Sequence, residues 1–122
     1  MPFAPGAHPR TAGTFSRILG KYVREEKALD LITALKKMTI MPAKRLEKIA
    51  PSMTRKGRLQ VGADADITIF NPNTIIDKAN FSGLKYSEGV EMVIIDGKII
   101  VQEGRIVENV FPGKPILSKY KK

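Results

Sequence analysis

The stretch that decides the fold reads GRLQVGADADITIFNP and covers residues 57–72 of a chain of 122 residues. Within it, Asp66–Phe70 is rich in β-branched side chains, which favour extended backbone. The Asn71-Pro72 pair that follows is typical of a turn, because asparagine bonds to its own backbone and proline fixes φ. The stretch therefore predicts a turn, a polar approach and a short strand.

Toward the C-terminus, two further β-rich segments surround Asp96-Gly97. An Asp-Gly pair between such segments is a strong hairpin signal, because a type I′ turn needs positive φ at both central residues. We expect the strands of this hairpin over Glu91–Ile95 and Lys98–Gln102. A second turn at Glu103-Gly104 predicts one more short strand over Arg105–Val107.

Toward the N-terminus, the pattern changes from β to helical. Residues 1–13 are rich in proline and glycine and predict an extended arm. A helix is expected from Thr14, its N-cap. The apolar stripe of that helix follows the helical period and consists of Phe15, Ile18, Leu19, Tyr22 and Val23. A second helix is predicted from Asp30 to about Met38, and a short third helix from Pro42 to about Ile49.

Helices that precede strands, instead of alternating with them, indicate an α+β fold. The chain divides into an extended arm over residues 1–13, a helical segment over 14–50, a β-subdomain over 57–117 and a basic tail over 118–122. The length suits one domain with one modest core.

Composition narrows the classes of function. The chain has no cysteine, which excludes disulfides and thiolate metal sites and leads us to expect a cytoplasmic protein. No apolar run approaches the ~18 residues that span a bilayer, and the N-terminus lacks the pattern of a signal peptide. A net charge of +9 raises nucleic acid as a partner. However, the basic residues are dispersed pairs without interleaved aromatic rings, so we expect a solvated surface instead.

Patterns in both halves resemble one family. The first half contains HPRTAGTF at residues 8–15, followed by KMT at 37–39. The second half contains GADADI at 62–67 and DGK at 96–98. Together these resemble the D-aminoacylase (N-acyl-D-amino-acid deacylase) branch of the metal-dependent amidohydrolases, over most of the chain. The first pattern is fairly specific to that branch, whereas the last two are generic to the superfamily.

The resemblance implies the end of a TIM-type barrel followed by a C-terminal β-subdomain that completes a β-sandwich. It also implies a zinc-dependent enzyme that hydrolyses the non-peptide amide C–N bond of N-acyl-D-amino acids. Zinc there lowers the pKa of bound water and an aspartate shuttles protons. Here His8 is the only histidine, and the Ser-Asp-Gly segment expected before it is absent. We therefore expect no catalytic residue and no zinc or other cofactor site in this chain.

A few residues are candidates for binding. By resemblance, Arg10 binds the substrate α-carboxylate, for which a guanidinium offers a planar bidentate fork; the alternative is a solvated arginine on a loose arm. A metal role for His8 is not expected, because a lone histidine is usually structural or solvated. Asp64 and Asp66 form an Asp-x-Asp pair without the later glycine and glutamate of a calcium loop. We interpret Asp66 as capping a turn at the strand entry.

Two functions stay open. The first is a C-terminal fragment of an amidohydrolase, inactive alone, that packs against the rest of the enzyme. The second is an independent basic module that binds nucleic acid or a protein. We expect self-association or binding to the missing N-terminal part of the barrel, and neither nucleic acid nor a membrane as the usual partner.

Overall fold

Helices fill the first half of the chain and strands the second, which confirms the α+β class. The structure is a computed structural model that describes residues 8–83 and 85–120. Its elements in chain order are α1 (Arg10–Arg17), the π-helix η1 (Ile18–Glu25), α2 (Leu31–Met38), α3 (Ile40–Leu46), the 3-10 helix η2 (Pro51–Arg55), β1 (Ile67–Phe70), β2 (Val90–Ile95), β3 (Lys98–Gln102) and β4 (Arg105–Ile106).

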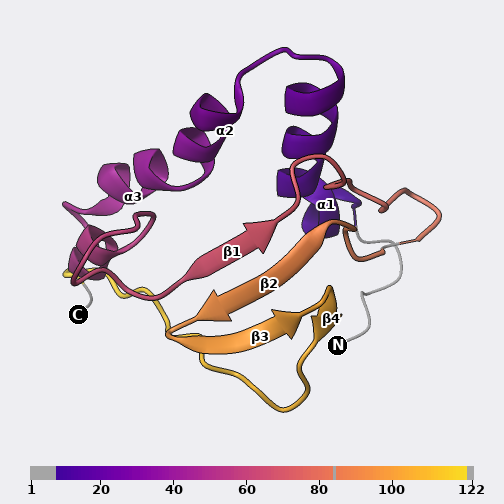
Figure 1. The fold of residues 1–122 in the computed structure, drawn as a ribbon. Coiled ribbons are helices and arrows are strands. Elements are labelled where there is room, and N and C mark those ends of the chain that lie inside the picture. Colours follow the sequence, from indigo (N-terminus) through magenta and orange to yellow (C-terminus); the bar gives the residue numbers. More distant parts are fainter. Residues whose placement is uncertain (1–7, 84, 121–122) are drawn as a thin grey trace.

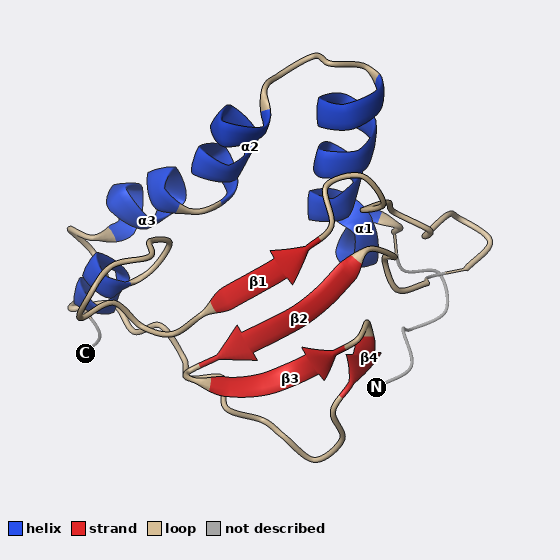
Figure 2. Ribbon diagram, in the orientation of Figure 1, coloured by secondary structure: helices blue, strands red, loops and turns tan. Residues whose placement is uncertain are grey.

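The strands form one antiparallel sheet in the order β1-β2-β3-β4. The helices arch over the β1 side of this sheet, as Figure 1 shows. α1 and η1 lie beside the end of β1, whereas α2 and α3 descend toward its start, and Figure 2 separates the helical arch from the strands by colour. The helical segment and the β-subdomain thus meet mainly at the end of β1.

The predicted hairpin is confirmed. β2 and β3 pair in antiparallel register with Val93 opposite Val101. The turn between them has φ of 48° at Asp96 and 75° at Gly97, which are the positive values that a type I′ turn requires. A residue from outside the turn also contacts it, because Oδ1 of Asp66 accepts a hydrogen bond from the backbone N–H of Asp96 at 2.9 Å. Asp66 therefore caps this turn from just before β1, and the strand starts one residue later than predicted.

The buried core is small and lies in two clusters. Leu19, Ala34 and Ile75 join η1, α2 and the loop after β1. The second cluster holds Ala43, Ala50 and Met53. The accessible surface is 9225 Å² for a mass of 13.5 kDa, whereas a compact monomer of that mass exposes about 6,500 Å². The chain thus covers less of its own surface than a self-contained domain of its size.

The first helix corrects two predictions. It begins at Arg10 instead of Thr14, so the extended arm was wrong for residues 10–13, while residues 1–7 lie outside the described part of the chain. Pro9 takes the N-cap position, where the lack of an N–H costs nothing. Thr14 lies inside the helix, and its hydroxyl donates to the carbonyl of Arg10 at 2.6 Å.

The predicted apolar stripe of this first helical segment is only partly a packing face. Leu19 is buried, and Ile18 and Val23 pack partly against the core. Phe15 and Tyr22 are instead 63% and 37% exposed. The segment continues from α1 into the π-helical turns of η1, and the wider winding moves the residues off a single α-helical stripe.

The second helix agrees with prediction, because Oδ1 of Asp30 caps it by accepting from the N–H of Thr33 at 2.9 Å. The third helix starts at Ile40, before Pro42, and ends at Leu46. Pro42 still lies in the first turn, where proline is tolerated.

Two further segments are held to the helical part of the chain. The residues after Ala50 form η2. In the basic tail, the N–H of Lys119 donates to the carbonyl of Ile49 at 2.9 Å. Within the described residues, no helix is both long enough and apolar enough to cross a bilayer.

Candidate functional site

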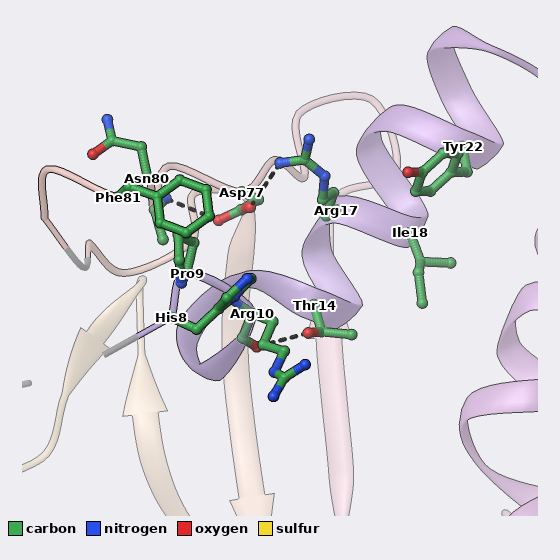
Figure 3. A pocket seen from close by; sticks show the side chains of 11 residues that line it. His8, Pro9, Arg10, Thr14, Arg17, Ile18, Tyr22, Asp77, Asn80 and Phe81 are labelled. Atoms are coloured by element: carbon green, nitrogen blue, oxygen red, sulfur yellow. Dashed lines mark hydrogen bonds and ion pairs between the residues drawn. The ribbon is translucent and has the colours of Figure 1, made fainter. Parts of the chain in front are cut away.

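A pocket of about 500 Å³ lies between the first helical segment and the loop that follows β1. α1 and η1 form one wall and residues 77–81 form the other (Figure 3). Its lining combines apolar and aromatic surface with two guanidinium groups and consists of His8, Pro9, Arg10, Thr14, Arg17, Ile18, Tyr22, Asp77, Ala79, Asn80 and Phe81. This size and this mixed lining are typical of a small-molecule site.

The predicted residues His8 and Arg10 both line this pocket. The backbone N–H of Arg10 donates to Nδ1 of His8 at 3.1 Å, which places the proton of a neutral imidazole on Nε2. The ring of His8 packs edge-on against Phe81 with centroids 5.0 Å apart. The His-Pro-Arg turn is thereby joined to a loop that is remote in sequence, although Phe81 itself is 83% exposed.

The guanidinium of Arg10 is available to a ligand. Arg10 is exposed, and its side chain forms no ion pair with any carboxylate of residues 8–83 and 85–120. In Figure 3 it extends away from Asp77, whereas Arg17 reaches toward that carboxylate. A guanidinium without an internal counter-charge can offer its fork to an incoming carboxylate.

Asp77 fastens the two walls of the pocket together. Its side chain is 7% exposed and its Oδ2 lies 3.5 Å from a guanidinium nitrogen of Arg17. Its Oδ1 accepts from the N–H of Ala79 at 2.8 Å. The carboxylate also sits directly over Gly13, where a Cβ would lie 1.8 Å from Oδ1. The sequence analysis did not identify Asp77. Its one local signal is that an aspartate can accept a hydrogen bond from the N–H two residues later in the chain.

The Asp64 and Asp66 pair is held by cations. Oδ1 of Asp64 accepts from Arg55 at 2.9 Å, and Oδ2 accepts from Lys56 at 3.0 Å. The ammonium of Lys56 also binds Asp66, so one lysine bridges both carboxylates. Sequence reasoning did not single out Lys56.

Within this cluster, the pKa values of Asp64 and Asp66 are lowered and the pKa of Lys56 is raised. The hydrogen bond from Lys56 lowers the pKa of Asp64. Burial acts to raise the pKa of Asp66, but the hydrogen bonds from Lys56 and from the N–H of Asp96 outweigh it and the pKa is lowered. The hydrogen bond to Asp66 raises the pKa of Lys56. All three groups are therefore charged near neutrality, which suits a structural ion-pair cluster and not an acid–base pair.

The described residues do not fit a zinc site. Among them, no group of three or more His, Cys, Asp or Glu side chains is placed to hold a metal ion. Structural and catalytic zinc sites need at least three protein ligands, and the chain has one histidine. Nδ1 of that histidine already accepts a backbone hydrogen bond.

Comparisons with known proteins confirm the resemblance. Residues 4–101 match the model of the amidohydrolase family. The N-acyl-D-glutamate deacylase of Alcaligenes xylosoxydans xylosoxydans is 41% identical over 98 residues, which make up 80% of this chain and 19% of that protein. The chain therefore spans about a fifth of the length of the curated relatives it matches.

Solved structures agree with the sequence relatives. A crystal structure of D-aminoacylase matches with a TM-score of 0.75 and 31% identity, covering 84% of this chain and 21% of that one. The N-acyl-D-glutamate deacylase from Bordetella bronchiseptica, solved with zinc and a phosphonate that mimics the tetrahedral intermediate, matches with a TM-score of 0.71 and 33% identity. That match covers 80% of this chain and 22% of the deacylase chain.

Proposed function

Because the chain belongs to the amidohydrolase family, we propose that it is the C-terminal region of a hydrolase that cleaves the amide C–N bond of N-acyl-D-amino acids. Its helices are the last helices around a TIM-type barrel, and its sheet completes a β-sandwich with strands from the N-terminal part of the enzyme. The supporting evidence is the likeness to deacylases of this class at 41% and 33% identity.

The observation that carries the proposal is the His-Pro-Arg turn at the pocket. Arg10 lines the pocket with an exposed guanidinium that forms no internal ion pair in the described residues. We assign it the α-carboxylate of the substrate, which a guanidinium binds through two parallel hydrogen bonds. His8 supports the turn through its bond to the N–H of Arg10 and does not bind metal.

The 122 residues are inactive by themselves under this proposal. A zinc ion supplies a water of lowered pKa in metal-dependent hydrolysis, and the described residues hold no ligand set for it. The metal ligands and the proton-shuttling carboxylate come from polypeptide outside these residues. The location we propose is the cytoplasm, since a chain without cysteine needs no oxidising compartment.

A chimera tests the proposal. The chain would replace the matching C-terminal region of the Alcaligenes N-acyl-D-glutamate deacylase, and release of the acyl group from N-acyl-D-glutamate would be measured with zinc present. We expect an active chimera and an inactive isolated chain. In the chimera, Arg10→Gln should raise KM by at least about tenfold, the loss of one charge-assisted carboxylate contact. Lys98→Gln on β3, far from the pocket, is the matched control.

Two outcomes contradict different parts of the proposal. A folded, zinc-loaded chimera without activity would show that this chain cannot serve as the C-terminal region. An active chimera unaffected by Arg10→Gln would remove the carboxylate role from Arg10 alone. The alternative of an independent basic module for nucleic acid or protein is favoured only if nucleic acid copurifies with the isolated chain, which its ultraviolet absorbance spectrum reveals.

A further inference from the structure

The outer flank formed by α2 and α3 carries positive charge without internal counter-charge. Its basic residues are all exposed, and none forms an ion pair with a carboxylate of the described chain. Glu47 lies among them in sequence, but its carboxylate forms an ion pair with Arg58. We call these residues the basic helix face; they are Lys36, Lys37, Lys44, Arg45 and Lys48.

Apolar side chains are exposed on the same two helices and on the turn that follows α3. Ile32 and Met41 are 58% and 54% exposed, and Leu46 and Ile49 are 41% and 46% exposed. A solvated helix normally turns such side chains inward and keeps only its charged residues in water. The flank therefore mixes apolar and cationic groups, as the centre and rim of an interface do.

The two helices are short, and the chain leaves one side of each uncovered. α2 has 8 residues and α3 has 7, with Ala34 and Ala43 buried respectively. Leu31, Leu35 and Met38 of α2 pack partly against the core, whereas Ile32 and Met41 are exposed. Helices shorter than ~12–15 residues are marginal in water unless tertiary packing supports them. Figure 1 shows both helices on the outside of the arch, with the sheet on their inner side. The exposed sides of both helices are thus open to a covering surface beyond these residues.

The positive charge of the basic helix face indicates what kind of surface covers α2 and α3. A second copy would bring one basic helix face against another, and like charges in contact oppose association. Nucleic acid would satisfy the cations but offers nothing to the exposed aliphatic side chains, and no aromatic ring on these helices could stack on a base. Carboxylates around an apolar centre satisfy both groups at once.

We propose that the basic helix face docks on an acidic protein surface with an apolar centre, and that this surface belongs to the barrel-forming part of the amidohydrolase. The inference rests on the proposed function and adds the chemistry of the contact. Lys44 in α3 and Lys48 in the turn that follows it are four residues apart, the spacing that places side chains one helical turn apart on one side, so they can face one acidic strip.

Carbodiimide crosslinking of the chimera tests this contact, because the reagent joins lysine directly to a carboxylate without a spacer. Peptide mass spectrometry should find Lys44 and Lys48 coupled to carboxylates of the deacylase portion. Their crosslink yield should exceed that of the exposed control Lys98 by about tenfold, since the reaction needs ion-pair proximity. High salt should reduce the difference.

Paired variants separate docking from mere surface charge. Lys44→Gln with Lys48→Gln should lower the melting temperature of the chimera more than that of the isolated chain, because helix-dipole effects are common to both and cancel in the comparison. Lys85→Gln with Lys98→Gln should show no such difference.

Equal crosslinking at Lys98 and Lys44 in an active chimera would overturn the docking proposal alone. An inactive, uncrosslinked chimera would overturn the proposed function with it, and preferential binding of a DNA duplex to Lys44 and Lys48 would replace the protein partner.

Discussion

The carboxylate of Asp77 lies directly on the backbone of Gly13, so close that a Cβ at residue 13 would be 1.8 Å from Oδ1. This contact joins α1 to the loop after β1 and sets the width of the pocket between them. A side chain at residue 13 would displace this carboxylate from its contacts with Arg17 and the N–H of Ala79, although the position is inside a helix, where alanine is intrinsically favoured over glycine by about 1 kcal/mol.

Gly13→Ala should therefore destabilise the chain, against its helix propensity. The steric conflict should cost about 1–3 kcal/mol, as overpacking does in other proteins. Denaturant unfolding of the wild type, Gly13→Ala, Asp77→Ala and the double variant measures it. In the double variant the clash is gone, so the effects should be strongly non-additive. A stabilised Gly13→Ala chain would show that Asp77 does not lie over residue 13.

The hairpin gives a second prediction. Gly97 has φ of +75° and no heavy atom within 4 Å of an added Cβ, so a side chain there meets only backbone strain. Gly97→Val should cost at least about 1–2 kcal/mol, because a β-branched residue resists positive φ. Gly97→Asn is the control, since asparagine tolerates the left-handed region. Equal melting temperatures for the two variants would contradict the turn geometry.

These two sites show what the sequence could and could not predict. The turn at Asp96-Gly97 was predictable because its signal lies in adjacent residues. Asp30 was likewise predictable as a cap, because capping is local. The contact of Asp77 with Gly13 joins residues far apart in the chain, and no local period reports it.

The candidate site follows the same division. His8 and Arg10 were identified through a contiguous motif. Phe81 and Asp77, which complete the pocket, are brought there only by the path of the chain after β1. The start of the first helix was misplaced because the proline and glycine content of residues 1–13 predicted an extended arm, whereas Pro9 at the N-cap is compatible with a helix.

The Lys56 cluster predicts how stability depends on pH. The pKa values of Asp64 and Asp66 are lowered in the folded state, so their stabilisation is complete above the unfolded value of about 4 and is lost as pH falls through the folded values. The pKa of Lys56 is raised. Its contribution is complete below the unfolded value of about 10.4 and is lost as pH rises through the folded value.

Urea unfolding at a series of pH values checks this window. The wild type should have a plateau from about pH 5 to pH 10 and lose stability on both sides. Lys56→Met should reduce the loss of stability on the acid side, because protonating Asp64 or Asp66 then no longer breaks an ion pair with the lysine. Part of the acid limb should remain, since Arg55 still binds Asp64. An acid limb unchanged in Lys56→Met would show that the lysine does not hold these carboxylates.

Self-association of the isolated chain is the remaining prediction. The accessible surface of 9225 Å² exceeds that of a compact monomer by more than the ~800 Å² per partner of a standard interface. Phe15 and Tyr22 on the first helical segment are exposed, and β1 and β4 form the two edges of the sheet. We propose that, without the rest of a barrel, these apolar side chains and open edges pair between copies.

The charge decides how this association responds to salt. At a net charge of +9 two copies repel each other, so screening should strengthen self-association, whereas docking of the basic helix face on an acidic surface should weaken with salt. Light scattering across a dilution series at low and high salt distinguishes the two. Phe15→Ser should shift the equilibrium toward monomer, and Lys98→Gln on the inner strand β3 should not. A chain that stays monomeric and folds cooperatively at every concentration and ionic strength would show that these residues close their own core, and would favour an independent module over a C-terminal region.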